Sequence, residues 1–321
     1  MSGQPALNVT DMDRSPYAPW ATNLLDFTDP SSPFHRLTLP SHQSFIDMLS
    51  YQHHYHAGNH ADVLKHWTLL ACVRHMQKKD KPFDYIDTHA GAGFYRLDSA
   101  MAKKTNEADE GVLKINWKKQ PGLKDYHGQI AADIKARSYP GSPLLVKRLL
   151  RPGDKAWLFE MHPKTLRELK NHCEHRRLCH VRQEDGFQGL LSLLPVASRR
   201  ALVLIDPSYE IKSDYQTVVT VMKKAWQKMP QATMLLWYPV VDAGQIQQME
   251  KAFAKSSMRN VHLMEMGIED SEQPGMTASG MIVVNPPWTL ADEFNATMPA
   301  VSEMLSKDKK SRYRYQVLVA E

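Results

Sequence analysis

A carboxylate, a proline and an aromatic ring follow a short apolar run in the second half of the chain. The run is formed by residues 202–205, and Asp206, Pro207, Ser208 and Tyr209 come directly after it. A run of this length that ends in Asp-Pro is typical of a buried parallel strand and its turn. Ligands of open α/β sheets bind where such strands end. The stretch could therefore hold a planar amino-purine: the Asp206 carboxylate and the Pro207 carbonyl would accept from its amino group, and Tyr209 would stack on its face. An ordinary strand and turn is the alternative.

Three earlier predicted strands also end on an acid, at Asp87, Glu160 and Asp185. Gly91 and Gly93 follow Asp87 in a tight turn, and glycine lets the backbone approach a ligand closely. The third glycine of the dinucleotide fingerprint is missing, so we expect a nucleoside-like cofactor without phosphates, such as S-adenosylmethionine (SAM). Glu160 would bind its ribose hydroxyls, and Asp185 would accept from its adenine amino group. A simple strand-to-helix turn is the alternative for the glycine segment.

A second motif, Asn285-Pro286-Pro287-Trp288, matches the same pattern of amide or acid, proline and aromatic residue. Strand order argues against it. Asp206 ends the fourth acidic strand, which adjoins the first strand at the switch point of a doubly wound sheet. Asn285 would end a late strand near the sheet edge. We therefore prefer Asp206.

A histidine-rich block spans residues 48–66, where Asn59 would cap a helix. Its five histidines suggest zinc, but the block contains no cysteine and Asp62 is its one carboxylate; a His-Cys cluster at 171–180 lacks the usual ligand spacing. We expect no metal. The block would instead form a polar lip where Tyr51 and the histidines stack on bases or donate to phosphates.

Composition limits the class of protein. The chain has 321 residues, a net charge of +5 and three cysteines, which favours a polyanionic partner and a reducing cytoplasm over a disulfide framework. No apolar run is long enough to span a bilayer. Residues 1–47 are expected to be a disordered extension, with a translation start at Met48 as one alternative. Lys-rich residues 98–140 are expected to be a helical insertion, Ser142 to cap the next helix, and residues 307–315 to be a basic terminus with aromatic residues.

Several of these stretches together closely resemble the RlmJ family, bacterial adenine-N6 methyltransferases of large-subunit ribosomal RNA. The resemblance covers about residues 48–321. Its motifs are residues 48–66, 87–93, 139–143, 185–187, 237–241 and 275–280.

The resemblance implies a Rossmann-like, SAM-dependent methyltransferase fold: an α/β, mostly parallel, doubly wound sheet with a small helical insertion subdomain. It implies a cytoplasmic monomer that uses SAM and acts on 23S ribosomal RNA, with no membrane or metal. Asp206 would be the catalytic acceptor and Tyr51 would contact the RNA. With Gly91 and Asp206 included, the SAM site would be formed by Lys65, His66, His89, Gly91, Ser142, Glu160, Asp185, Gly186 and Asp206.

One residue departs from the family pattern Asp-Pro-Pro-Tyr, because Ser208 replaces the second proline. Both acceptors remain, and only the restriction that a second proline places on Pro207 is lost. We expect a looser turn and slower chemistry. Three alternatives stay open: a DNA adenine-N6 methyltransferase with the same chemistry, a non-catalytic RNA-binding protein disabled by Ser208, and a small-molecule methyltransferase, which the basic excess disfavours.

Overall fold

The computed structural model describes residues 53–210, 213–271, 273 and 275–321. All the elements below lie in the unit Tyr51–Glu321. The predictions for Tyr51 and for residues 1–47 lie outside the described residues.

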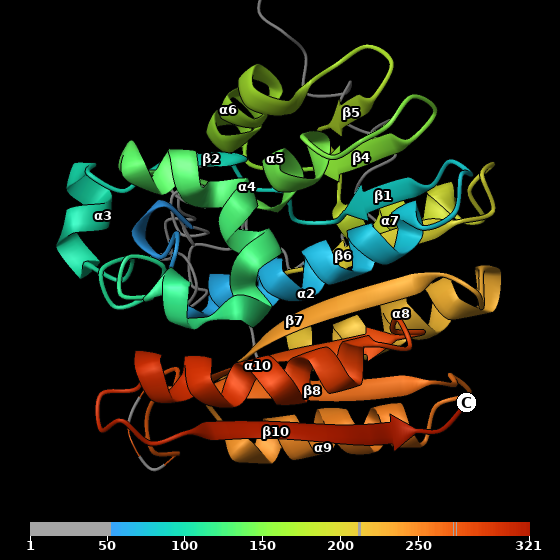
Figure 1. Ribbon diagram of the computed structural model, residues 1–321. Coiled ribbons are helices and arrows are strands. Elements are labelled where there is room, and N and C mark those ends of the chain that lie inside the picture. The colour runs from blue at the N-terminus through green and yellow to red at the C-terminus, as the bar shows by residue number, and fades with distance from the viewer. Residues whose placement is uncertain (1–52, 211–212, 272, 274) are drawn as a thin grey trace, which may run out of the picture. The chain divides into compact units, whose positions relative to one another are not determined.

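Helices and strands alternate along most of the described chain (Figure 1). The strands are β1 (Asp84–Asp87), β2 (Phe94–Arg96), β3 (Ser138–Pro140), β4 (Lys155–Phe159), β5 (Cys179–Arg182), β6 (Ala201–Ile205), β7 (Thr233–Val240), β8 (Val261–Gly267), β9 (Ala278–Val284) and β10 (Arg312–Val319). The α-helices are α2 (His60–Gln77), α3 (Ala100–Thr105), α4 (Lys124–Lys135), α5 (Ser142–Lys147), α6 (Pro163–Cys173), α7 (Gly186–Leu193), α8 (Asp214–Lys228), α9 (Ala243–Ala254) and α10 (Leu290–Leu305). Short 3₁₀ helices are η2 (His53–Tyr55), η3 (Trp117–Lys119) and η4 (Pro121–Leu123).

Eight strands form one mixed sheet in the order β10-β8-β9-β7-β6-β1-β4-β5. Strands β5, β4, β1, β6 and β7 pair in parallel, whereas β9, β8 and β10 add antiparallel pairs. The parallel pairing of β1 with β6 places Asp87 opposite Leu204. The α/β class, the parallel core and the adjacency of the first and fourth acidic strands are therefore confirmed.

The strand residues alternate between two buried clusters, one on each face of the sheet. Leu202 and Leu204 of β6 belong to one cluster, and Val203 and Ile205 belong to the other. Helices α2 and α10 cover the first face, and α8 and α9 cover the second (Figure 1). Because both faces of β6 are covered by helices, its sequence is a continuous apolar run, as expected for a doubly wound sheet.

Helix α2 is buried on almost every side, although it contains charged residues. It packs on β6, β7 and β9 and also contacts α4 and α10. Asn59 caps it by accepting from the Asp62 backbone N–H, which confirms the predicted cap. Asp62, Lys65 and His66 lie at i, i+3 and i+4, so they occupy one side of the helix and are buried together.

Residues 97–137 run between β2 and β3, which pair with each other as a two-stranded antiparallel sheet. This segment contains α3, η3, η4 and α4. Trp67 of α2 donates to the Gly122 carbonyl at 3.0 Å, and a Cβ at Gly122 would lie 2.1 Å from Thr297 Oγ1 of α10. The segment is thus packed against both helices that cover the first face.

The C-terminal strands differ from the sequence prediction. Strand β9 lies inside the sheet between β7 and β8, and it runs antiparallel to β7. Asn285 therefore follows β9 at the opposite end of the strands from Asp206, beside the start of β7. Its side-chain amide donates there to the carbonyls of Pro230 at 2.7 Å and Ala232 at 2.9 Å. Residues 312–315 of the basic segment 307–315, predicted as a terminus, belong instead to the edge strand β10, because residues 312–319 pair with β8.

Candidate active site

Asp206 follows β6 and forms an ion pair with a lysine from α2. Lys65 Nζ lies 2.7 Å from Asp206 Oδ2 and 2.9 Å from Asp62 Oδ1. The side chains of Lys65, Asp62 and Asp206 are 5%, 1% and 16% exposed. A cation that lies between two carboxylates in a poorly solvated site keeps all three groups charged.

The pKa shifts of this cluster follow from its charges. Burial raises the pKa of the Asp62 carboxyl, but the Lys65 ammonium and neighbouring histidines outweigh burial and hold that pKa well below its usual range. Burial lowers the pKa of Lys65, but Asp206 and Asp62 together hold it well above its usual range. An ion-paired carboxylate such as that of Asp206 accepts hydrogen bonds and does not donate them.

The carboxyl end of β1 forms a second part of the site. Asp87 Oδ2 accepts from the Tyr85 and Ser142 hydroxyls, each at 2.7 Å. Burial is the largest influence on the Asp87 carboxyl and raises its pKa to about 6. Gly141, and not Ser142, occupies the N-cap position of α5, so the predicted Ser142 cap is wrong. The Ser142 hydroxyl turns to Asp87 because the buried carboxylate needs donors.

The glycine turn after β1 has the left-handed backbone that the sequence predicts. Gly91 and Gly93 have φ values of +63° and +76°. A Cβ at Gly186, the first residue of α7, would lie 1.8 Å from the Thr88 carbonyl oxygen. Glycine at 186 is thus required for α7 to begin directly against the end of β1. This contact brings the turn and the start of α7 together.

The two other acids lie beside this turn. The Glu160 carboxylate accepts from the His162 N–H at 2.7 Å, and burial raises its pKa. Asp185 Oδ1 caps α7 by accepting from the Gln188 N–H at 2.8 Å. His89 packs edge-on against Phe187, with ring centroids 5.0 Å apart, and burial lowers the pKa of His89 to about 4.

These parts fit a nucleoside cofactor. Strands β1, β4, β5 and β6 are parallel neighbours, so Gly91, Glu160, Asp185 and Asp206 follow strand ends at one edge of the sheet. Two carboxylates beside a turn of left-handed glycines offer acceptors for ribose hydroxyls and an adenine amino group, as SAM requires. The assignment of each residue to SAM stays a prediction.

One predicted residue, His66, makes contacts deeper in the molecule. His66 Nδ1 pairs with the Tyr139 hydroxyl at 2.6 Å, which in turn pairs with the Tyr126 hydroxyl at 2.6 Å. Burial lowers the pKa of His66 to about 3, so this histidine is a neutral member of a buried chain. Its predicted contact with SAM stays a prediction.

The residues after Asp206 form a turn against β7. Pro207 is buried and Ser208 is exposed. Tyr209 has a φ of 53°, and its hydroxyl donates to the Trp237 carbonyl at 2.8 Å. Its ring lies 4.6 Å from the Tyr215 ring and 5.9 Å from the Trp237 ring. Tyr209 is thus fixed in an aromatic group at the carboxyl ends of β6 and β7, and its stacking on a base stays a prediction.

Asp62 is the residue of this site that the sequence reasoning missed. In the sequence it is the one carboxylate of a histidine-rich block, and there it suggests only a metal ligand. The available signal was its spacing: Asp62 and Lys65 are i, i+3 on a helix that is otherwise strongly apolar. Charged pairs in such a helix are buried together.

Within residues 53–210, 213–271, 273 and 275–321, no group of three or more His, Cys, Asp or Glu could hold a metal ion.

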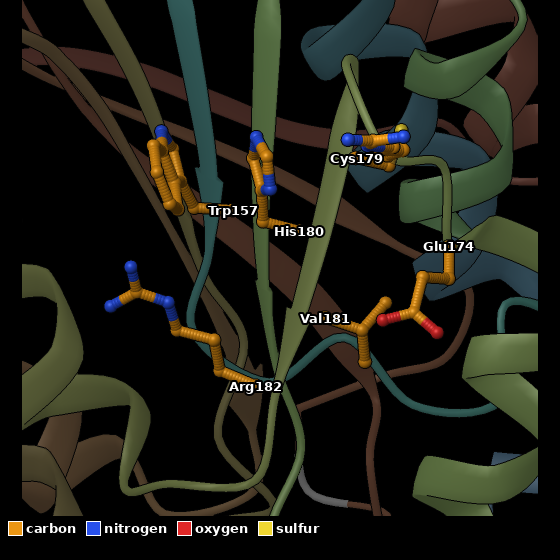
Figure 2. Close-up of a pocket in the computed structure, with 7 residues that line it drawn as sticks. Trp157, Glu174, Cys179, His180, Val181 and Arg182 are labelled. Carbon is orange, nitrogen blue, oxygen red and sulfur yellow. The ribbon is translucent and has the colours of Figure 1, made fainter.

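A hollow of about 470 Å³ lies along β5 at the sheet edge, where the Trp157 ring stacks on His180 with centroids 4.5 Å apart (Figure 2). None of the predicted site residues lines this hollow. No helix in the described part of the chain has the length and apolar character of a membrane span.

A family model and two known proteins of matching description are similar to most of this chain. A family model described as "Ribosomal RNA large subunit methyltransferase D, RlmJ" matches residues 80–318. "Ribosomal RNA large subunit methyltransferase J" of Escherichia coli (strain K12) is 42% identical over 263 residues, covering 78% of this chain and 92% of that protein. The protein of the same name from Haemophilus influenzae (strain ATCC 51907 / DSM 11121 / KW20 / Rd) is 40% identical over 267 residues, covering 80% and 94%.

One solved structure is similar over most of the chain. It is the crystal structure of protein LPL1258 from Legionella pneumophila str. Philadelphia 1, which is 30% identical with a TM-score of 0.74 and covers 82% of this chain and 98% of that chain. The range matched by the family model runs from just before β1 into β10. Asp87, Glu160, Asp185 and Asp206 lie inside this range, whereas α2, with Lys65, precedes it.

Proposed function

The chain belongs to the RlmJ family of ribosomal RNA large subunit methyltransferases, and on that premise we propose that it methylates the exocyclic N6 of one adenine in 23S ribosomal RNA with SAM as donor. The resemblance found in the sequence is thereby confirmed at the level of the family. The target atom, the methyl donor and the residue roles are our proposal. We also propose that the substrate is protein-free or early-assembly RNA, in which the target base is accessible.

One observation supports the proposal more than any other: a charged, partly buried Asp206 follows β6, beside the glycine turn of β1. Lys65 engages Oδ2, so we assign Oδ1 as the acceptor for one hydrogen of the adenine amino group. The Pro207 carbonyl is the second acceptor. Pro207 is buried, so packing limits the movement of its carbonyl, while Ser208 in place of a second proline leaves the ψ of Pro207 less restricted than in the family pattern.

The chemistry needs these acceptors because the N6 lone pair is delocalised into the purine ring. Bonding both hydrogens favours a more tetrahedral nitrogen whose lone pair can attack a carbon in line. When bound, SAM would supply that carbon as the methyl group of its sulfonium: the C–S bond would break as the N–C bond forms, the neutral thioether S-adenosylhomocysteine would leave, and the methylated nitrogen would then lose one proton to water. A neutral aryl amino group is too weak an acid to be deprotonated by a carboxylate, so Asp206 orients the amino group without first removing its proton.

Recognition of the base requires that it leave its stack. Bases that undergo chemistry are extruded into a pocket, and bases in single-stranded RNA are extruded most cheaply. We propose that the Tyr209 ring stacks on the target base, which would contribute ~1–3 kcal/mol. Tyr209 is prepared for this role because its hydroxyl is bound by the Trp237 carbonyl. Ser208 is exposed, so its side chain does not pack inside the turn. Its effect is therefore on the flexibility of the turn.

The test compares two aspartates that follow neighbouring parallel strands. Asp206→Asn replaces an acceptor oxygen with an N–H donor, and we expect methyl transfer to fall about 10²–10³-fold while SAM still binds. Asp242→Asn is the matched control, because Asp242 follows β7 and caps α9, and asparagine caps a helix equally well. Transfer is measured from labelled SAM to protein-free 23S ribosomal RNA, with duplex DNA as the competing substrate.

Three outcomes are decisive. Normal turnover by Asp206→Asn would contradict the assignment of the acceptor. Preferred methylation of duplex DNA would favour the DNA methyltransferase alternative. Methylated adenine at a position other than N6, identified by mass spectrometry of digested RNA, would leave the family intact and refute the proposed target atom.

A further inference from the structure

A second carboxylate lies behind the Lys65–Asp206 ion pair, on the side of α2. We propose that Asp62 is a positioning residue that shares the Lys65 ammonium with Asp206 and so keeps the acceptor site negatively charged toward a cationic methyl donor. This inference rests on the proposed function, because it assumes that the donor is SAM. It extends that function by assigning a role to a residue outside the proposed cofactor and RNA contacts.

The geometry makes Lys65 a shared cation. Its Nζ is 2.9 Å from Asp62 Oδ1 and 2.7 Å from Asp206 Oδ2, so the ammonium forms an ion pair with both carboxylates at once. Asp62 and Lys65 are separated by one helical turn on α2, and both are buried. The ammonium therefore remains between the two acids whether or not the methyl donor and the target base are bound on the Asp206 side.

Asp62 is itself fixed through its other oxygen. Oδ2 accepts from the Gly58 N–H at 2.8 Å and lies 3.1 Å from His53 Nε2. Gly58 has a φ of +82°, and a Cβ there would lie 2.9 Å from Val112 Cγ2, so the turn before α2 has little freedom. Because Asp62 is bound from both sides, it cannot follow Lys65 toward Asp206, and it fixes the position of the lysine instead.

The charge of the cluster is the functional consequence. Two carboxylates and one ammonium give Asp62, Lys65 and Asp206 a summed formal charge of −1. If Asp62 were neutral, Lys65 would compensate Asp206 fully and the sum would be zero. A residual negative charge in a poorly solvated site favours the cationic sulfonium of SAM over the neutral thioether of S-adenosylhomocysteine (SAH). It also leaves Asp206 a stronger acceptor for the adenine amino group.

The test measures this preference directly, without RNA. Dissociation constants for SAM and SAH are determined by calorimetry at pH 8, above the ordinary titration range of histidine, for the full-length wild type, Asp62→Asn and Asp62→Ser. Both variants remove the charge, and they differ in size and in hydrogen bonding. Asp154→Asn is the matched control, because Asp154 is also buried and paired, with Arg151 at 3.1 Å, at the start of β4.

We expect the ratio of the SAH to the SAM dissociation constant to fall about tenfold in both Asp62 variants, which is the effect of one unit charge across roughly 12 Å at an effective dielectric constant of about 20. In Asp154→Asn the ratio should stay within about twofold of wild type, since no charge near the donor changes. The ratio is independent of the fraction of folded protein, because both ligands are measured on the same preparation.

The outcomes separate the two levels of the proposal. Equal weakening of SAM and SAH in the Asp62 variants, or an unchanged ratio, would overturn the role of Asp62 and leave the proposed function standing. A wild-type protein that binds neither ligand would overturn the proposed use of SAM. Should Asp62→Asn fail to fold, the ratio in Asp62→Ser decides in the same way.

Discussion

Gly186 is the position where a single methyl group should disrupt the site most. A Cβ there would lie 1.8 Å from the Thr88 carbonyl oxygen, 2.6 Å from the Thr88 carbonyl carbon and 2.8 Å from its Cα. All three atoms belong to the backbone at the end of β1, so no side-chain rotation can relieve the clash. For Gly186→Ala, α7 or the β1 end must move by roughly 1.5 Å to restore an ordinary contact.

The magnitude of the effect follows from what that movement displaces. The shift would separate Asp185 and Gly186 from the Gly91–Gly93 turn, and a misplacement of about 1 Å costs roughly 10²-fold in a well-oriented site. Overpacking itself should destabilise the fold by ~1–3 kcal/mol. We therefore expect the rate of methyl transfer to fall about 100-fold, SAM binding to weaken and the melting temperature to fall by several degrees.

The control is Gly128→Ala, at a glycine inside α4. A Cβ at Gly128 has no heavy atom within 4 Å, so alanine should stabilise the helix by ~0.5–1 kcal/mol. SAM affinity is measured by calorimetry and stability by thermal unfolding. Wild-type SAM affinity in Gly186→Ala would refute the proposal that the start of α7 and the end of β1 form the cofactor site together.

Three further predictions follow from the same geometry. Lys65→Met leaves Asp62 and Asp206 without their shared cation, so it should destabilise the protein by ~3–5 kcal/mol; a denaturation midpoint equal to wild type would show that the cluster is not buried in solution. Burial raises the pKa of Asp87 to about 6 in the folded state, above its unfolded value of about 3.9. The folded state therefore binds the proton more tightly. This contribution to stability is fully present below about pH 4 and is lost as the pH rises through about 6. The free energy of unfolding of wild type, relative to Asp87→Asn, should therefore fall by about 3 kcal/mol between pH 4 and pH 8, and chemical denaturation that shows no such change would contradict the prediction. Asn285→Ala removes two hydrogen bonds, one exposed and one partly buried, at the end of the sheet opposite to Asp206, so stability should fall by ~0.5–1.5 kcal/mol with methyl transfer per folded molecule unchanged; a selective loss of transfer would restore the competing motif.

The amino-acid sequence was informative where local patterns and neighbouring structure agree. The apolar run that ends at Asp206 is a buried parallel strand in the structure, and Asn59 caps α2 as its side chain predicts. The order of the acidic strand ends correctly placed the Asp206 strand beside the first strand. These features depend on periodicity, capping and strand order, all of which are visible in the chain itself.

Features that depend on distant partners were missed or wrong. Ser142 stands where a helix cap is plausible, but a buried Asp87 attracts its hydroxyl. Residues 307–315 are basic with interleaved aromatic residues and suggest a terminus, but residues 312–315 belong to β10, which pairs with β8 and forms the sheet edge. In each case the deciding interaction comes from a segment more than forty residues away, and local composition contains no trace of it.

The sequence by itself determined the fold class, the family resemblance and the acids at the strand ends, because each arises from short patterns of residue type. Only the tertiary structure decided which charges meet. It brings Lys65 of α2 to Asp206 across 141 positions, and it buries Asp62 behind them. Burial makes these charges interact strongly, since water no longer screens them, and burial is a property of the assembled layers and not of any one segment.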